Sequence, residues 1–385
     1  MKFLKNNYNI NEVFVKKKLF FVTSVFILFF CISCNEKDYV INLKWNKSYP
    51  SDTIKKNSIA LKWCLSFLGS HIATDTTLTG FNISNETITL KVDQLGFSKK
   101  ASDYLAQLNW KLKQTEEYQQ NNAIDLGRYI ALTIGSSYHY YKVVEIPQKL
   151  EDYKSLYKFD SISGYIDNSS ISLVDRIISF TKNNTGNKQA YISAEIDSIT
   201  KNIYEFETAE VMNNGQIRFG IYDKNGNLKD AADNQVTNAG KPAKCIWCHE
   251  TGIQPMFRKQ KDHKNYLSYQ NLQDSLKFFN QKLRTYQDTL WKDPVIKNRR
   301  LHTEMEISYI AFMEPSAEHL SNEWGLPIKE VLKKLNHLKT HRHHEFGFLG
   351  DLYHRKDIDS LAPWKVLRVP ERIREKSENE VNYIE

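Results

Sequence analysis

Residues 189–228 decide the fold class, and they read QAYISAEIDSITKNIYEFETAEVMNNGQIRFGIYDKNGNL. Short runs rich in β-branched and aromatic residues alternate here with turn residues, which is the pattern of antiparallel strands. Asn214-Gly215 and Asn225-Gly226 are strong hairpin signals, because both residue types accept a positive φ. Together with the run before them, these residues predict four strands, at 170–181, 189–197, 204–212 and 216–223.

Helical patterns flank this strand-rich segment on both sides. Before it, Ser98 is expected to cap a helix with leucines at helical spacing, and Asp125 to begin a shorter apolar helix. After it, residues 272–290 alternate apolar spacings of four and three, which indicates one long amphipathic helix. Residues 300–313 and 328–338 continue as helices. The sequence therefore predicts an α+β fold with an antiparallel sheet between helical segments.

A chemical motif follows the predicted sheet. The run Lys244-Cys245-Ile246-Trp247-Cys248-His249 contains the pattern C-x-x-C-H. In this pattern two thiols three residues apart reach the two vinyl groups of one porphyrin, and the next histidine reaches the iron from the same side. By this pentad the chain resembles the c-type cytochromes. The resemblance implies one covalent haem c on Cys245 and Cys248, with His249 as the proximal iron ligand.

The order of elements adds a second resemblance. A strand-rich segment that ends in C-x-x-C-H looks like the cytochrome P460 group, whereas small all-helical cytochromes have a helix there. The C-terminal helices are then expected to pack around the haem. Three other interpretations of the pentad remain open: a redox dithiol, which normally follows a strand in a βαβ unit, a zinc site of Cys245, Cys248 and His249, and a structural disulfide.

The iron ligand opposite His249 is not fixed by the spacing. The resemblance to c-type cytochromes favours Met313, because the distal methionine of that family lies downstream near a proline, here Pro315. Met256 is expected to pack against the haem edge, since it follows His249 by only seven residues. The histidine-rich tract over 337–354 is an alternative source of ligands. An iron with no distal protein ligand would instead indicate an enzyme or a gas sensor.

The N-terminus carries an export pattern. Three lysines precede the run LFFVTSVFILFF at residues 19–30, and Ile32-Ser33-Cys34 follows it. Twelve residues fall short of the about 20 that cross a membrane comfortably, which favours a signal peptide. The tail resembles a bacterial lipobox and implies a lipid on Cys34. We expect an exported protein anchored to the envelope membrane, facing the periplasm or the cell surface; an uncleaved anchor helix is the alternative.

Composition and net charge limit both the class of protein and the kind of partner that it can bind. The chain has 385 residues, 41% of them hydrophobic and 25% charged, with a formal net charge of +8. These values exclude a collagen, a disulfide scaffold and a disordered chain, and the spread of charge argues against nucleic acid binding. Basic residues gather around the motif and are expected to attract an acidic redox partner in the envelope. They are Lys241, Lys244, Arg258, Lys259, Lys261 and Lys264.

These signals divide the chain into expected segments. They are a signal peptide at 1–33, a tether at 34–57, a mainly helical region at 58–160, an antiparallel β region at 161–242, a haem attachment segment at 243–264, a helical region at 265–345 and an extended tail at 346–385. Cys64, inside the helical region, is expected to be a buried core residue.

Three functions compete on this sequence. The first is a membrane-tethered monohaem cytochrome that transfers electrons in the cell envelope. The second is a haem enzyme or a gas or redox sensor with an open iron site. The third is a non-haem binding lipoprotein in which the pentad is structural. Because no G-x-G-x-x-G motif, P-loop or well-spaced Ser-His-Asp set occurs, nucleotide enzymes and hydrolases are not expected.

Overall fold

A five-stranded antiparallel sheet forms one half of the fold, in the order β5-β6-β7-β8-β9. In the computed structural model its strands are β5 (Gly164–Ile166), β6 (Asp175–Phe180), β7 (Ala190–Ile196), β8 (Ile203–Val211) and β9 (Ile217–Asp223). Neighbours in the sheet are neighbours in the chain, so the sheet is a meander, and Asn214-Gly215 makes the β8–β9 turn with Gly215 at φ +85°. The four predicted strands are confirmed as β6 to β9.

The structure describes residues 36–182, 188–299, 301–378 and 380–384. The predicted signal peptide and Cys34 lie outside the described residues. Residues 38–385 make one compact unit. Within the described residues no helix is both long and apolar enough to cross a membrane.

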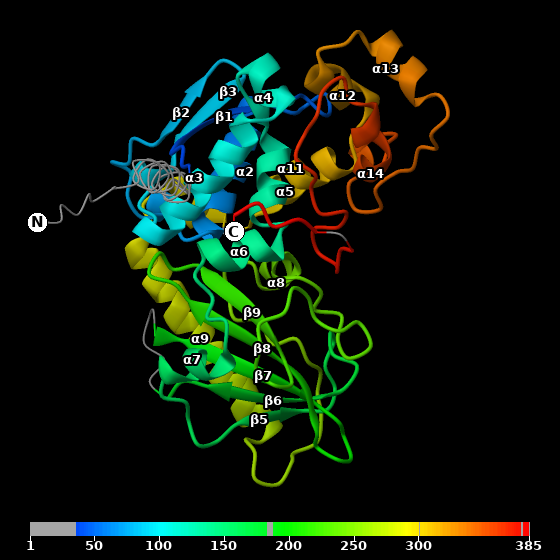
Figure 1. Cartoon of the computed structure of the whole chain (residues 1–385). Helices are drawn as coiled ribbons and strands as arrows, with labels where there is room; N and C mark the ends of the chain where they lie inside the picture. Colours follow the sequence, from blue (N-terminus) through cyan, green and yellow to red (C-terminus); the bar gives the residue numbers. More distant parts are fainter. Residues whose placement is uncertain (1–35, 183–187, 300, 379, 385) are drawn as a thin grey trace, which may run out of the picture. The chain divides into compact units, whose positions relative to one another are not determined.

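The N-terminal part combines a smaller sheet with helices (Figure 1). The sheet order is β2-β3-β1-β4, with β1 (Val40–Lys44), β2 (Phe81–Ser84), β3 (Thr87–Lys91) and β4 (Ile124–Asp125). The helices are α2 (Ile54–Phe67), α3 (Lys99–Lys113), α4 (Glu116–Asn121), α5 (Leu126–Thr133), α6 (Ser137–Val143) and α7 (Leu150–Ser155). Ser98 and Asp125 cap α3 and α5 as expected.

The prediction of a tether at residues 34–57 is wrong from residue 40 onward. Val40–Lys44 form β1, which pairs antiparallel with β3 and parallel with β4. Ile41 and Leu43 are fully buried on one face of this strand. Five residues give too short an alternation to be distinguished from a linker, and only pairing with distant strands makes the segment a strand.

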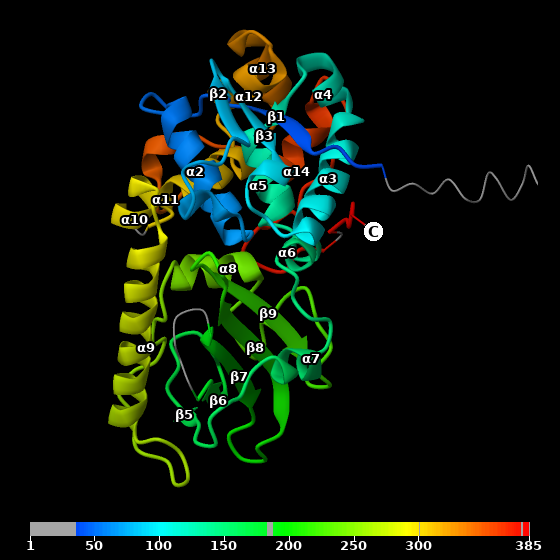
Figure 2. The ribbon, with the colours of Figure 1, turned by 90° about the vertical axis from the view of Figure 1, so that its left-hand side faces the viewer.

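Helices follow the five-stranded sheet. They are α8 (Pro242–His249), α9 (Tyr269–Leu290), α10 (Pro294–Arg299), α11 (Thr303–Met313), α12 (Ala317–Trp324), α13 (Ile328–Leu335) and α14 (Arg355–Ile358). Figure 2 shows α9 running along the five-stranded sheet, with α8 at the β9 side of that sheet. α11 instead packs on α2 and α5 in the N-terminal helical layer.

The chain therefore has an α+β fold, as the sequence predicts. The polar tail over 346–385 is mostly irregular, with the short helix α14, and it still buries apolar side chains such as Leu352, Ile358 and Ile373.

Cys64 is fully buried in the core, where burial raises the pKa of its thiol to about 12. This confirms the expected core position of Cys64.

Candidate functional site

The pentad forms the C-terminal end of α8. Pro242 stands in the first turn, where a proline suits a helix, and the helix ends because Glu250 takes a positive φ of 49°. The pentad places Cys248 three residues and His249 four residues after Cys245. Both therefore lie on the same face of this helix as Cys245. Ile246 is fully buried and anchors α8 to the core.

This face lines an apolar cavity between α8 and the five-stranded sheet. The cavity has about 950 Å³ of space outside protein atoms, its open mouth included. Ile178 of β6 pairs with Ser193 of β7, and Ser193 pairs with Glu207 of β8. These three residues line the cavity. Strand alternation therefore directs these side chains to one face of the sheet.

The remaining wall comes from three other segments. The loop after α8 supplies Ile253, Pro255, Met256 and Phe257, and α9 supplies Leu276. Phe219 of β9 also lines the cavity, with its ring 5.4 Å from that of His249. Aliphatic and aromatic side chains thus make up most of the wall, which suits a flat apolar ring system such as a porphyrin.

His249 meets the conditions for an iron ligand. Burial lowers the pKa of its imidazole to about 4, and the nearby positive charge of Arg176 adds to this effect. The ring is therefore neutral at neutral pH, the form that binds metals. Its Nδ1 atom is buried and has no hydrogen-bond partner, so the cost of its desolvation is not offset by a protein contact.

The two cysteines of the pentad are free thiols. Burial raises the pKa of both, so the thiol forms prevail at neutral pH. The structural disulfide interpretation thus has no support in this conformation. The redox-dithiol interpretation also loses its usual context, because α8 follows an antiparallel meander and not a βαβ unit.

A polar pair interrupts the apolar wall on the sheet side. Arg176 and Glu207 line the cavity and form an ion pair with 2.6 Å between Nη2 and Oε2. Arg176 also pairs with the fully buried Glu195, at 2.5 Å. Burial raises the pKa of Glu195 to about 7, although Arg176 opposes this shift. The cavity therefore contains a charged group across from the apolar wall.

The structure does not place Met313 at this cavity. Met313 ends α11 and lines two other cavities, next to residues of the C-terminal tail. The interpretation of Met313 as the distal ligand is thus wrong for this arrangement, because α11 packs on α2 and α5. Among the C-terminal helices within the described residues, α9 alone lines the cavity, which also corrects the expectation that α11 and α13 cover it.

The outer side of α8 is held by the C-terminal strap, defined here as residues 372–378 and 380–384. The ammonium group of Lys241 pairs with Glu380 at 2.5 Å, and both side chains are almost fully buried. Lys244 pairs with Glu375 at 2.5 Å. These two lysines are therefore neutralised, and the predicted basic ring reduces to four exposed residues. They are Arg258, Lys259, Lys261 and Lys264.

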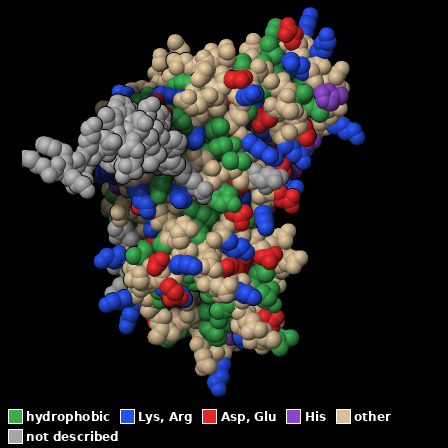
Figure 3. Space-filling view, viewed as in Figure 1, with side chains coloured by type: hydrophobic (Ala, Val, Ile, Leu, Met, Phe, Trp, Pro, Cys, Tyr) green, Lys and Arg blue, Asp and Glu red, His purple; other side chains and the backbone are tan. Residues whose placement is uncertain are grey.

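The histidine-rich tract lies elsewhere. α13 ends at Leu335, so His337, His341 and His344 do not share a helical face. His341 pairs with Glu314 at 2.7 Å and stacks on His354. Figure 3 shows histidine side chains gathered at one edge of the molecular face, between basic residues. No residue of this tract lines the cavity at α8.

A second polar cluster was missed by the sequence reasoning. The Oγ atom of Ser48 lies 2.7 Å from Nδ1 of His319, whose Nε2 lies 3.3 Å from Asp125. Burial lowers the pKa of His319, but Asp125 and Glu323 outweigh burial and raise it to about 9. A cationic imidazole cannot act as a general base on Ser48, so this is not a hydrolase triad. The i, i+4 spacing of His319 and Glu323 was the available sequence signal.

Comparison with protein-family models, with curated proteins and with solved structures finds no match to this chain.

Proposed function

We propose that the cavity at α8 holds one haem c, attached through Cys245 and Cys248 and bound at the iron by His249. The observation that carries this proposal is the placement of both thiols and the imidazole on one apolar cavity. Each S–H adds across one vinyl C=C, so no oxidant is needed and no atom leaves. Bound there, haem supplies a one-electron redox centre.

The protein groups then have separate roles. The apolar walls exclude water, and His249 stays neutral because it is buried. The exposed basic residues of the loop over 258–264 attract an acidic partner, and transfer of electrons in the cell envelope follows as the proposed function. The N-terminal export pattern and the lipid on Cys34 complete the proposal of a membrane-tethered, exported cytochrome.

A haem enzyme or sensor is the second candidate, and the Arg176–Glu207 pair favours it. This pair places a cation and a carboxylate on the sheet side of the cavity, where a polar substrate or ligand would meet hydrogen-bonding groups. An electron carrier does not need such groups. The third possibility, a non-haem lipoprotein with a structural pentad, would leave the apolar cavity without a role.

Spectroscopy of the exported full-length chain tests these functions. The proposal expects a Soret band, a pyridine haemochrome of a c-type haem and an intact mass increased by one haem. A chain that remains colourless when produced with a haem-attachment system would overturn the first two candidates. A reduced spectrum that shifts with carbon monoxide would favour the enzyme or sensor, whereas an unchanged spectrum would favour the electron carrier.

A further inference from the structure

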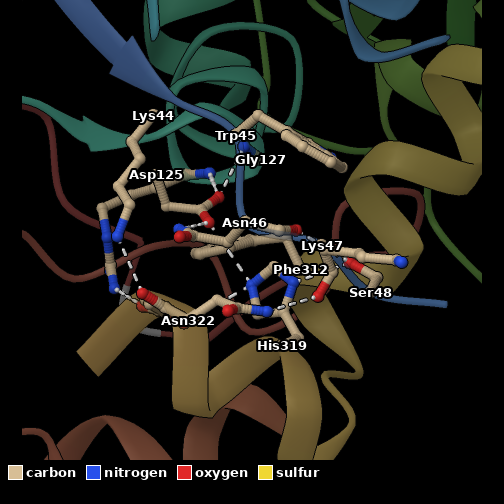
Figure 4. Close-up of polar contacts among 12 residues, drawn as sticks. Lys44, Trp45, Asn46, Lys47, Ser48, Asp125, Gly127, Phe312, His319 and Asn322 are labelled. Carbon is tan, nitrogen blue, oxygen red and sulfur yellow. Dashed lines mark hydrogen bonds and ion pairs between the residues drawn. The ribbon is translucent and has the colours of Figure 1, made fainter. Parts of the chain in front are cut away.

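The cluster around His319 has the composition of a metal site. Asp125 caps α5, while His319 and Glu323 lie one turn apart on α12. One ligand atom from each residue lies within 4.8 Å of the other two. Figure 4 shows the His319 ring with Asp125 toward one of its nitrogen atoms and Ser48 toward the other, and Asn46 beside Asp125. None of these residues lines the cavity at α8, so the cluster is a separate site.

Two buried atoms in this cluster have no hydrogen-bond partner. One is Nε2 of His319, which lies 3.3 Å from Asp125 and 3.5 Å from Glu323 without a well-aligned bond to either. The other is Oδ1 of Asn46, whose amide nitrogen donates to Asp125 at 2.6 Å. His319 and Asn46 are 3% and 5% exposed, so water does not satisfy these atoms at the surface. Both atoms therefore lack the partner that buried polar groups normally have.

The other ring nitrogen of His319 is already fixed. Ser48 lies 2.7 Å from Nδ1 and is itself buried. Histidines that bind metals commonly use one nitrogen for the metal and hold the other in a hydrogen bond. Ser48 therefore orients the imidazole with Nε2 toward the two carboxylates.

The charge of the surroundings also suits a divalent cation. Three carboxylates, those of Glu117, Glu323 and Asp359, pair with the guanidinium groups of Arg128 and Arg355, and a fourth, that of Asp125, lies beside His319. With the imidazole protonated, four negative and three positive charges leave a net charge of −1. A divalent cation that displaces the imidazole proton brings the net charge to zero, and uncompensated charge in a buried site is costly.

We propose that Asp125, His319 and Glu323 bind one divalent transition-metal ion, with Asn46 as an adjacent oxygen donor. Two carboxylates and one imidazole are a ligand set for ions such as Mn²⁺ or Zn²⁺. A cavity of about 10 Å³ next to Asn46, Ser48 and His319 is close to the size of one water molecule. The ion ties the segment around Asn46, the start of α5 and α12 together, so its role is structural.

Metal titration of the full-length holoprotein tests the site. Because the histidine-rich tract over 337–354 competes for added metal, the background carries His341→Gln, His343→Gln and His344→Gln. We expect one Mn²⁺ or Zn²⁺ per chain by calorimetry and a Tm that rises with metal concentration. Pulsed electron paramagnetic resonance of the Mn²⁺ form should show coupling to an imidazole nitrogen. That coupling is lost in His319→Gln.

Two further variants keep the test decisive. Ser48→Ala retains all three ligands and should weaken binding about 10- to 100-fold, because it removes the hydrogen bond that orients the imidazole of His319. His302→Gln is the matched control, because His302 is also buried and has Glu306 four residues later. It should leave metal binding unchanged. No binding of either metal in the surface-histidine background, or equal nitrogen coupling in His319→Gln, overturns the proposal.

Discussion

The guanidinium group of Arg374 lies over the indole ring of Trp247, with 4.3 Å from Cζ to the ring centroid. Trp247 is the central residue of the pentad on α8, and Arg374 belongs to the C-terminal strap. The same guanidinium lies 5.5 Å from the ring of Tyr309 on α11. The strap therefore contacts both α8, which carries the pentad, and α11, which packs on the N-terminal helical layer.

Removing the carboxylate of Glu380 should destabilise the fold strongly. Glu380→Gln leaves the ammonium group of Lys241 buried without its counter-ion. Loss of one partner of a buried pair costs about 3–5 kcal/mol of the free energy of unfolding. Urea unfolding of the full-length chain measures this change.

The matched control is Asp351→Asn at the exposed pair of Arg342 and Asp351. Exposed pairs contribute at most about 1 kcal/mol, so this variant should unfold almost as the wild type does. Equal losses in both variants would show that the strap does not depend on the buried pair.

Replacing the pentad thiols should abolish covalent haem attachment. In Cys245→Ser/Cys248→Ser, acid–acetone extraction should remove all haem from the purified protein, whereas it should remove none from the wild type. Cys64→Ser is the control, because Cys64 lies in the core next to Thr133 and away from the cavity. Retention of covalent haem in the double variant would refute the assignment of these thiols.

Substitution of Met256 and of Met313 tests which methionine lies near the proposed haem. Met256 lines the cavity at α8 and Met313 does not. We therefore expect Met256→Leu to alter the visible spectrum or the midpoint potential of the haem, and Met313→Leu to leave both unchanged. Loss of a low-spin spectrum in Met313→Leu would restore Met313 as the distal ligand.

Acid should weaken the fold through His139. This histidine donates from Nδ1 to Leu132 and accepts the N–H of Tyr383 at Nε2, and burial lowers its pKa to about 4. The unfolded chain takes up this proton near pH 6.5, so the stabilising preference for neutral His139 is complete above that pH and is lost as the pH falls toward 4.

The expected contribution of His139 is a fall in the free energy of unfolding of up to about 1.4 kcal/mol per pH unit between these values. Urea unfolding at pH 7, 6 and 5 measures the slope. His139→Gln should be less stable at pH 7 but should show a smaller slope. An unchanged slope in this variant would mean that another group accounts for the pH dependence.

Local patterns predicted the elements that carry their own signal. The meander is readable because Asn214-Gly215 fixes a turn between alternating strands, and α5 is readable because Asp125 caps an apolar helix. β1 was missed, since its five residues become a strand only by pairing with distant partners. Met313 was misplaced because a position near a proline says nothing about which neighbours its helix packs against.

The sequence by itself determined the α+β class, the strands of the meander and the grouping of two thiols and an imidazole on one helical turn, because these depend on residues close together in the chain. Tertiary structure alone decided what that turn faces. Register across β6 to β8 places Arg176 and Glu207 on the cavity wall. Long-range packing brings Ser48, Asp125 and His319 together, since contacts between distant segments depend on the whole core and not on local spacing.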